Sequence, residues 1–176
     1  MKAVAFLRAI NVGGHTVKMD RLRGLFEQAG LAGVETFIAS GNVIFETRAR
    51  SFGALEKKLE AHLARVLGYD VATFIRSTAD LAAIESHRAF PAGEAAALYI
   101  GFLQAAPAAA AVRTLMGLQS DNDAFHVHGR EVYWRCRSRF SDSTFSGAAL
   151  EKALGMPATM RNVTTVRKLA ARYDDS

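Results

Sequence analysis

The first half of the chain alternates between strand-like and helix-like patterns of hydrophobic residues. Residues 3–7 are apolar at every position, which is typical of a strand that is buried on both faces. Apolar residues recur at helical spacing over residues 22–29 and 55–66, with a glycine shortly after each segment to end the helix. β-Forming residues fill three further segments, residues 33–39, 43–45 and 71–75. The order strand, helix, strand, strand, helix, strand predicts a ferredoxin-like unit.

The second half repeats this order of elements. A strand pattern covers residues 98–103, and the Ala-rich segment from Pro107 to Met116 has the apolar face of a helix. Two alternating segments on either side of Gly129-Arg130 predict a β-hairpin. Three shorter elements complete the pattern: a helix that ends at Gly155, a strand over residues 158–160, and a terminal helix capped by Thr164 or Thr165.

These elements predict an α+β fold of tandem duplicated ferredoxin-like (βαββαβ) subdomains. We place the first subdomain in residues 1–76 and the second, with the C-terminal helix, in residues 97–176. Residues 77–96 are expected to form a connecting helix and linker, because Ser77 and Asp80 have the spacing of a helix cap. The duplication is inferred from the order of elements, since the two halves share little similarity residue by residue.

Composition narrows the class of protein without naming an activity. Hydrophobic residues make up 50% of the 176 residues, enough for a sizeable core, and the net charge is +5 with a pI near 9.7. A basic chain favours anionic partners such as nucleic acid, nucleotides or phosphorylated metabolites. The one cysteine, Cys136, excludes an intrachain disulfide and has the pattern of a buried residue. Without a signal-peptide pattern or an apolar run of about 18 residues, we expect a cytoplasmic protein with no membrane segment.

The strongest candidate for a ligand site is the segment from Leu7 to Gly14 (LRAINVGG), which leaves the first strand and leads into the first helix. Backbone N–H groups at the start of a helix, with Arg8 and Lys18 nearby, are suited to binding an anion. In a ferredoxin-like sheet, the turn at Ser40-Gly41-Asn42 opens at the same edge as this loop. The topology therefore predicts that the two segments line one anion-binding edge.

Both segments also have a purely structural interpretation. Gly13 and Gly14 lack the third glycine of a dinucleotide-binding motif and the Gly-Lys-Ser/Thr of a P-loop. They would serve equally to turn the chain into the helix, because glycine adopts positive φ at little cost. Gly41 and Asn42 are likewise residues that a tight hairpin turn requires. The sequence leaves both interpretations open.

The predicted hairpin carries a second group of polar residues. His126 and His128 lie on one face of a strand, which suits metal binding, but no pattern in the sequence supplies a third ligand, and we assign no metal. If the pleats align, the two histidines share an exposed face with Tyr133, Arg135 and Arg137. A basic face with an aromatic residue is typical of single-stranded nucleic-acid binding, and also of an ordinary solvated sheet surface.

The chain contains three ordered motifs: residues 7–14 (LRAINVGG), residues 40–43 (SGNV) and residues 159–165 (TMRNVTT). Together they resemble a bacterial family catalogued as domain of unknown function 1697, over nearly the whole chain. The resemblance implies two ferredoxin-like subdomains, whereas the family has no established activity. Ala9 stands where the family usually has glycine, and Val163 stands where it often has tryptophan.

The residues that match the motifs of this family are our candidate ligand-binding residues. They are Arg8, Asn11, Gly13, Gly14, Lys18, Ser40, Gly41, Asn42, Arg161 and Asn162. We assign no cofactor and no catalytic residue, since no nucleophile, base or carboxylate pair has a diagnostic spacing.

The leading hypothesis is a protein that binds an anionic ligand, a nucleotide or nucleic-acid phosphate, at the predicted edge. One alternative is an enzyme that acts on a small phosphorylated or carboxylated metabolite in the same cleft, where Asn11, Ser40 and Asn42 would orient the substrate. This alternative lacks a general base, for which His15 is the nearest residue in the sequence. Another alternative is a non-catalytic protein-interaction module. The sequence indicates no oligomeric state.

Overall fold

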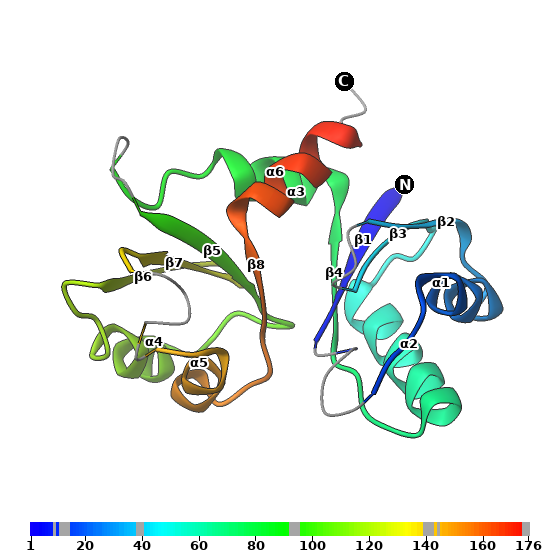
Figure 1. Ribbon diagram of the computed structural model, residues 1–176, viewed down its shortest axis with the longest axis horizontal. Helices are drawn as coiled ribbons and strands as arrows, with labels where there is room; N and C mark the ends of the chain where they lie inside the picture. Colours follow the sequence, from blue (N-terminus) through cyan, green and yellow to red (C-terminus); the bar gives the residue numbers. More distant parts are fainter. Residues whose placement is uncertain are drawn as a thin grey trace. The chain divides into compact units, whose positions relative to one another are not determined.

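The elements of the first half follow the order that the hydrophobic pattern predicts (Figure 1). They are β1 (Lys2–Leu7), α1 (Met19–Gln28), β2 (Ala32–Thr36), β3 (Asn42–Glu46), α2 (Phe52–Leu67) and β4 (Thr73–Ser77). The strands form one antiparallel sheet in the order β2-β3-β1-β4. This strand order is that of a ferredoxin-like unit, which confirms the predicted topology.

The computed structural model describes residues 1–8, 10, 15–37, 41–91, 96–138, 143 and 145–173. These residues fall into two compact units, one that runs to Asp80 and one from Leu81 to Tyr173. The boundary lies within α3 (Thr78–Ser86), which begins with the predicted cap. There, the N–H of Asp80 donates to Ser77 Oγ at 3.0 Å and the N–H of Ser77 donates to Asp80 Oδ2 at 2.9 Å. In this described part of the chain, no helix is long and apolar enough to cross a membrane.

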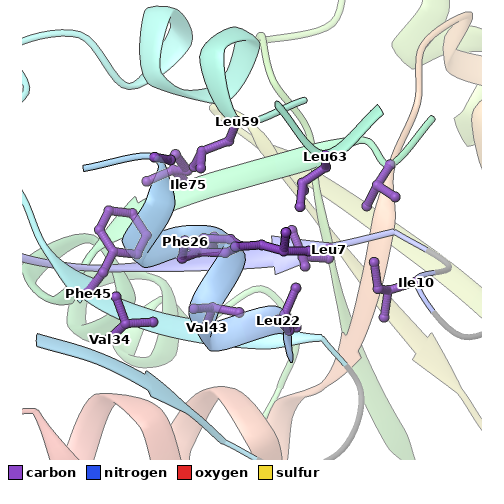
Figure 2. Close-up of a cluster of buried hydrophobic side chains, with 14 of the residues drawn as sticks. Leu7, Ile10, Leu22, Phe26, Val34, Val43, Phe45, Leu59, Leu63 and Ile75 are labelled. Atoms are coloured by element: carbon purple, nitrogen blue, oxygen red, sulfur yellow. The ribbon is translucent and has the colours of Figure 1, made fainter. Parts of the chain in front are cut away.

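The core of the first unit lies between its sheet and the helices α1 and α2. Alternate residues of β1 and β3 point into this layer, among them Leu7 and Phe45, and they pack against Phe26 of α1 and Leu59 of α2 (Figure 2). All residues from Ala3 to Leu7 are buried, as expected for a strand that is covered on both faces.

β4 lies at the edge of the first sheet, and side chains of α2 satisfy its outward N–H groups. The N–H of Thr73 donates to Glu60 Oε1 at 3.0 Å, and the N–H of Ile75 donates to Glu56 Oε2 at 3.0 Å. An unpaired strand edge would otherwise leave buried donors without acceptors. The two glutamates of α2 therefore complete the sheet at this side.

The second unit repeats the topology of the first. Its elements are β5 (Ala97–Phe102), α4 (Ala109–Met116), β6 (Asp123–His128), β7 (Glu131–Cys136), α5 (Gly147–Leu154), β8 (Thr159–Asn162) and α6 (Val163–Arg172). The antiparallel sheet has the order β6-β7-β5-β8, which is the same ferredoxin-like order. Trp134 and Cys136 point to the core that α5 covers, so the prediction of a buried thiol is confirmed.

The predicted cap of the last helix was wrong. α6 begins at Val163, and the cap is Asn162, whose Oδ1 accepts a hydrogen bond from the N–H of Thr164 at 2.9 Å. The reason is that β8 runs directly into α6 without a loop, so the first turn of the helix already contains Thr164 and Thr165.

The prediction of an exposed polar face on the hairpin was wrong for Tyr133, whereas His128 and Arg137 are exposed. His126 pairs with Tyr133 in the ladder, so these side chains do share a face of the sheet. However, Tyr133 is only 1% exposed, and its hydroxyl donates to the carbonyl of Ile84 at 3.0 Å. The chain after α3 and the helix α6 lie on this face, opposite to α4 and α5 (Figure 1). A helix that follows β8 must lie on one face of the sheet, and here it uses the face that a simple ferredoxin-like unit leaves open.

Candidate functional site

In the first unit, the end of β1 lies directly beside the turn that precedes β3. The N–H of Leu7 donates to the carbonyl of Gly41 at 2.9 Å, so Leu7 of one predicted segment lies directly beside Gly41 of the other. Gly41 is buried and has a φ of +76°. A Cβ at this position would lie 3.1 Å from Ile10 Cγ2 and 3.2 Å from Leu7 Cβ. The edge therefore requires glycine for both its backbone conformation and its packing.

Asn42 is part of the strand rather than of the turn. It is the first residue of β3, lies opposite Phe6 and is fully buried. Its Nδ2 donates to the carbonyl of Phe37 at 3.0 Å, which closes the connection between β2 and β3. This contact gives the side chain a structural role.

The two cations of the predicted site flank the same segment. Arg8 follows β1 and Lys18 is the N-cap residue of α1, and both are exposed. Lys18 provides no side-chain cap, so no side chain at the cap position accepts from the first turn of α1. Tyr69 donates from its hydroxyl to the carbonyl of Ile10 at 3.1 Å, and the ring of His15 stacks on Tyr69 at 3.8 Å. The Tyr69 contact ties the chain after β1 to the end of α2.

Four of the candidate residues lie outside the described residues: Asn11, Gly13, Gly14 and Ser40. The remaining pair, Arg161 and Asn162, belongs to the second unit. Arg161 Nη1 donates to Thr159 Oγ1 at 2.7 Å and to the carbonyl of Met160 at 2.9 Å. Burial lowers the pKa of its guanidinium to about 10, so the side chain still carries its charge at neutral pH. Asn162 caps α6, as described above.

The second unit contains a cavity of about 320 Å³ that the sequence did not reveal. Its walls combine apolar and aromatic side chains, including Phe90 and Tyr133, with three arginines, Arg88, Arg135 and Arg167. The guanidinium of Arg135 lies 5.9 Å from the ring centre of Phe90, and Arg167 Nε lies 3.3 Å from Glu85 Oε1. The cavity forms because the chain after α3 folds over the sheet, a long-range event with no local signal in the sequence.

Next to this cavity, the fold supplies the third histidine that the sequence pattern lacked. His87, which also lines the cavity, meets His126 and His128 of β6. The Nε2 atoms of His87 and His126 lie 3.0 Å apart, and the ring centres of His87 and His128 lie 4.1 Å apart. Burial and then the neighbouring His128 and His126 lower the pKa of His87, while the carboxylate of Glu131 opposes this shift. No pattern in the sequence had indicated that His87 would join these two histidines.

Comparison with solved structures supports the fold of both units. The chain is similar to a solved structure described as a conserved bacterial protein, SP0830, from Streptococcus pneumoniae. The two share 25% sequence identity, the match covers 99% of this chain and 98% of the other, and the TM-score is 0.76. No curated protein matches the chain. The family model for "Protein of unknown function (DUF1697)" matches residues 1–133, a span that includes two of the three motifs, and the chain therefore belongs to this family.

Proposed function

We propose that the protein binds an anionic ligand, the phosphate of a nucleotide or nucleic acid, at the edge of the first sheet where β1 ends and β3 begins. The observation that carries this proposal is the hydrogen bond between Leu7 and Gly41. It joins the last residue of β1 to the residue that precedes β3. Two exposed cations lie at the ends of the sequence between β1 and α1, Arg8 directly after β1 and Lys18 directly before α1.

The start of α1 supports the same proposal. A helix N-terminus carries a partial positive charge and donors that lack helical partners, and here the cap residue offers them no side-chain acceptor. Asp20 lies in the first turn, but its carboxylate is 3.7 Å from the guanidinium of Arg23. Arg8 and Lys18 would add charge-assisted hydrogen bonds to the oxygens of a phosphate. The net charge of +5 favours the approach of an anion.

Binding of a labelled single-stranded oligonucleotide and of a free nucleotide, each measured over a range of salt concentrations, tests the proposal. In a double variant, Arg8→Ala with Lys18→Ala, we expect weaker binding and, for the single-stranded oligonucleotide, a salt dependence whose slope falls by about 1.4. The matched control is Lys57→Ala with Lys58→Ala, which removes the same charge from exposed positions of α2. Equal losses in both double variants, or no loss in the first, would reject the edge as the site.

The cavity of the second unit favours a second candidate function, the binding of a small carboxylated or phosphorylated metabolite. Three arginines beside aromatic and apolar walls suit a ligand with an anionic group and an apolar body. A thermal-shift screen of such metabolites tests it, with Arg88→Ala as the variant that should abolish the response. If neither oligonucleotides nor metabolites bind, and the molecular mass in solution rises with protein concentration, the protein is instead an interaction module.

A further inference from the structure

Three of the five histidines of the chain gather at one place in the second unit. His126 and His128 are two residues apart on β6, so their side chains leave the same face of the strand. His87 comes from the segment after α3, 39 residues earlier than His126 in the sequence. One potential ligand nitrogen of each residue lies within 4.8 Å of those of the other two. We refer to these residues as the histidine cluster.

We propose that the histidine cluster binds a divalent transition-metal ion. This inference rests on residues of the second unit alone and is independent of the proposed anion-binding edge. Zinc bound by imidazole at about 2.0–2.1 Å in a tetrahedron has ligand nitrogens roughly 3.4 Å apart. The separation of 3.0 Å between His87 and His126 and the limit of 4.8 Å for all three bracket that value. The cluster therefore already has the dimensions of a three-histidine centre.

The three rings must change their tilt to bind one ion. Their planes now lie 13°, 15° and 23° from parallel, in the arrangement of a stack. The torsion about the bond that joins each ring to Cβ is soft, so the tilt can change while the backbone stays in place. His87 and His126 are half-buried and His128 is exposed, which leaves the ion a route from solvent.

The donors select the class of metal. Three imidazoles without a thiolate suit zinc, copper(II), nickel or cobalt, whereas magnesium and calcium prefer oxygen ligands. Cys136 cannot contribute, because on β7 it points to the opposite face of the sheet, with Trp134. Glu131 lies opposite His128 in the ladder, and its negative charge favours a cation near His87.

Three protein ligands leave a fourth position for water or for another ligand, as in catalytic rather than structural zinc sites. His87 also lines the cavity that contains the three arginines, so the metal centre adjoins that cavity. The centre and the cavity are therefore built partly from the same short segment after α3.

Metal binding by the full-length chain, prepared without a histidine tag and freed of metal with a chelator, tests this proposal. Calorimetric titration with zinc should give one ion per chain, and cobalt(II) should give the visible absorption bands of a tetrahedral site. His87→Ala and the double variant His126→Ala with His128→Ala should each weaken zinc binding at least about tenfold. The matched control removes the other two histidines, His15→Ala with His62→Ala, and should bind zinc as the unmodified chain does.

Circular dichroism of each variant shows whether the fold is retained, so that loss of binding is not confused with unfolding. His128→Gln provides a second, conservative variant at the most exposed ligand and should also lose zinc affinity. Absence of zinc binding to the unmodified chain would overturn the proposal and leave the cluster with the role of a structural ring stack. Binding that survives the double variant His126→Ala with His128→Ala, or that is lost in the control, would overturn it as well.

Discussion

The carboxylate of Glu56 accepts a hydrogen bond from the backbone N–H of Ile75 at 3.0 Å, and Glu56 is only 1% exposed. Glutamate is seldom so deeply buried without a partner. The partner here is the outer edge of β4, a strand with a neighbour on one side only. The helix α2 thus contributes to the sheet through hydrogen bonding as well as through its apolar face.

Glu56→Ala should therefore destabilise the first unit by about 1–3 kcal/mol, because the N–H of Ile75 loses its acceptor inside the protein. Glu56→Gln retains an oxygen acceptor and should cost less. Urea unfolding monitored by circular dichroism measures both, with Glu27→Ala on the exposed face of α1 as a control expected to stay within about 0.5 kcal/mol. A loss for Glu27→Ala as large as that for Glu56→Ala would argue against the edge contact.

Gly41→Ala should destabilise the first unit by about 1–3 kcal/mol. The added methyl group meets Ile10 and Leu7 at 3.1–3.2 Å, and φ of +76° is unfavourable for alanine. The control is Gly24→Ala in α1, where a Cβ meets nothing within 4 Å and helix propensity should add about 0.5–1 kcal/mol of stability. Opposite signs for the two substitutions in denaturant unfolding are the expected result.

Asn162→Ala should cost about 1 kcal/mol of stability in the second unit, because it removes the side-chain oxygen that caps α6. Thr164→Ala and Thr165→Ala lie after the cap and should change the free energy of unfolding by less. Thermal unfolding of the three single variants separates the observed cap from the cap predicted by the sequence. A larger loss at either threonine would contradict the observed cap.

Tyr133 should remain protonated at a pH where ordinary tyrosines ionise. Burial, and then the charge of Glu131, raise its pKa from 10.0 to about 12. Because the folded state resists ionisation, this contribution to stability is complete below pH 10 and is lost as the pH rises from 10 to 12. Phenolate absorbance during an alkaline titration should show a late-titrating tyrosine that is missing in Tyr133→Phe. If both proteins titrate alike, the phenol is accessible to solvent.

Zinc should raise the thermal stability of the second unit if the histidine cluster binds it. A free concentration one hundred times the Kd adds about 2.7 kcal/mol to the free energy of unfolding. The increase should disappear on addition of a chelator and should be absent in His87→Ala. An equal increase in His87→Ala would assign the effect to other sites.

The local pattern of the sequence was sufficient to predict the secondary structure and its order. Residues 3–7 form a buried strand and Gly68 ends α2 in the left-handed conformation, both as expected, because these features depend on neighbours along the chain. The cap of α6 was misplaced because a strand that enters a helix without a loop leaves no polar linker to mark the boundary. Periodicity locates elements more reliably than it locates their ends.

The site was harder to predict because its parts come together only in three dimensions. The position of Gly41 beside Leu7 followed from the topology of a ferredoxin-like sheet. The positions of His87 and Arg88 could not be predicted in this way, because no local sequence pattern indicates that the segment after α3 folds over β6 and β7. The sequence correctly predicted that His126 and Tyr133 share a face of the hairpin. It could not predict how exposed that face is, because the exposure depends on where α6 packs.

The hydrogen bond between Leu7 and Gly41 has a counterpart in the other half of the chain. There the N–H of Leu103, which follows β5, donates to the carbonyl of Arg130 at 2.9 Å. Arg130 directly precedes β7, the strand that pairs with β5, just as Gly41 precedes β3, which pairs with β1. Counting from these equivalent leucines, Gln104 occupies the place of Arg8, and at the helix cap Ala108 occupies the place of Lys18. The two units thus share this geometry but differ in where their charges lie, because the second unit has no cation at the positions of Arg8 and Lys18 and carries Arg130 at the position of Gly41. The second unit is therefore a built-in comparison for anything that the first edge binds through Arg8 and Lys18.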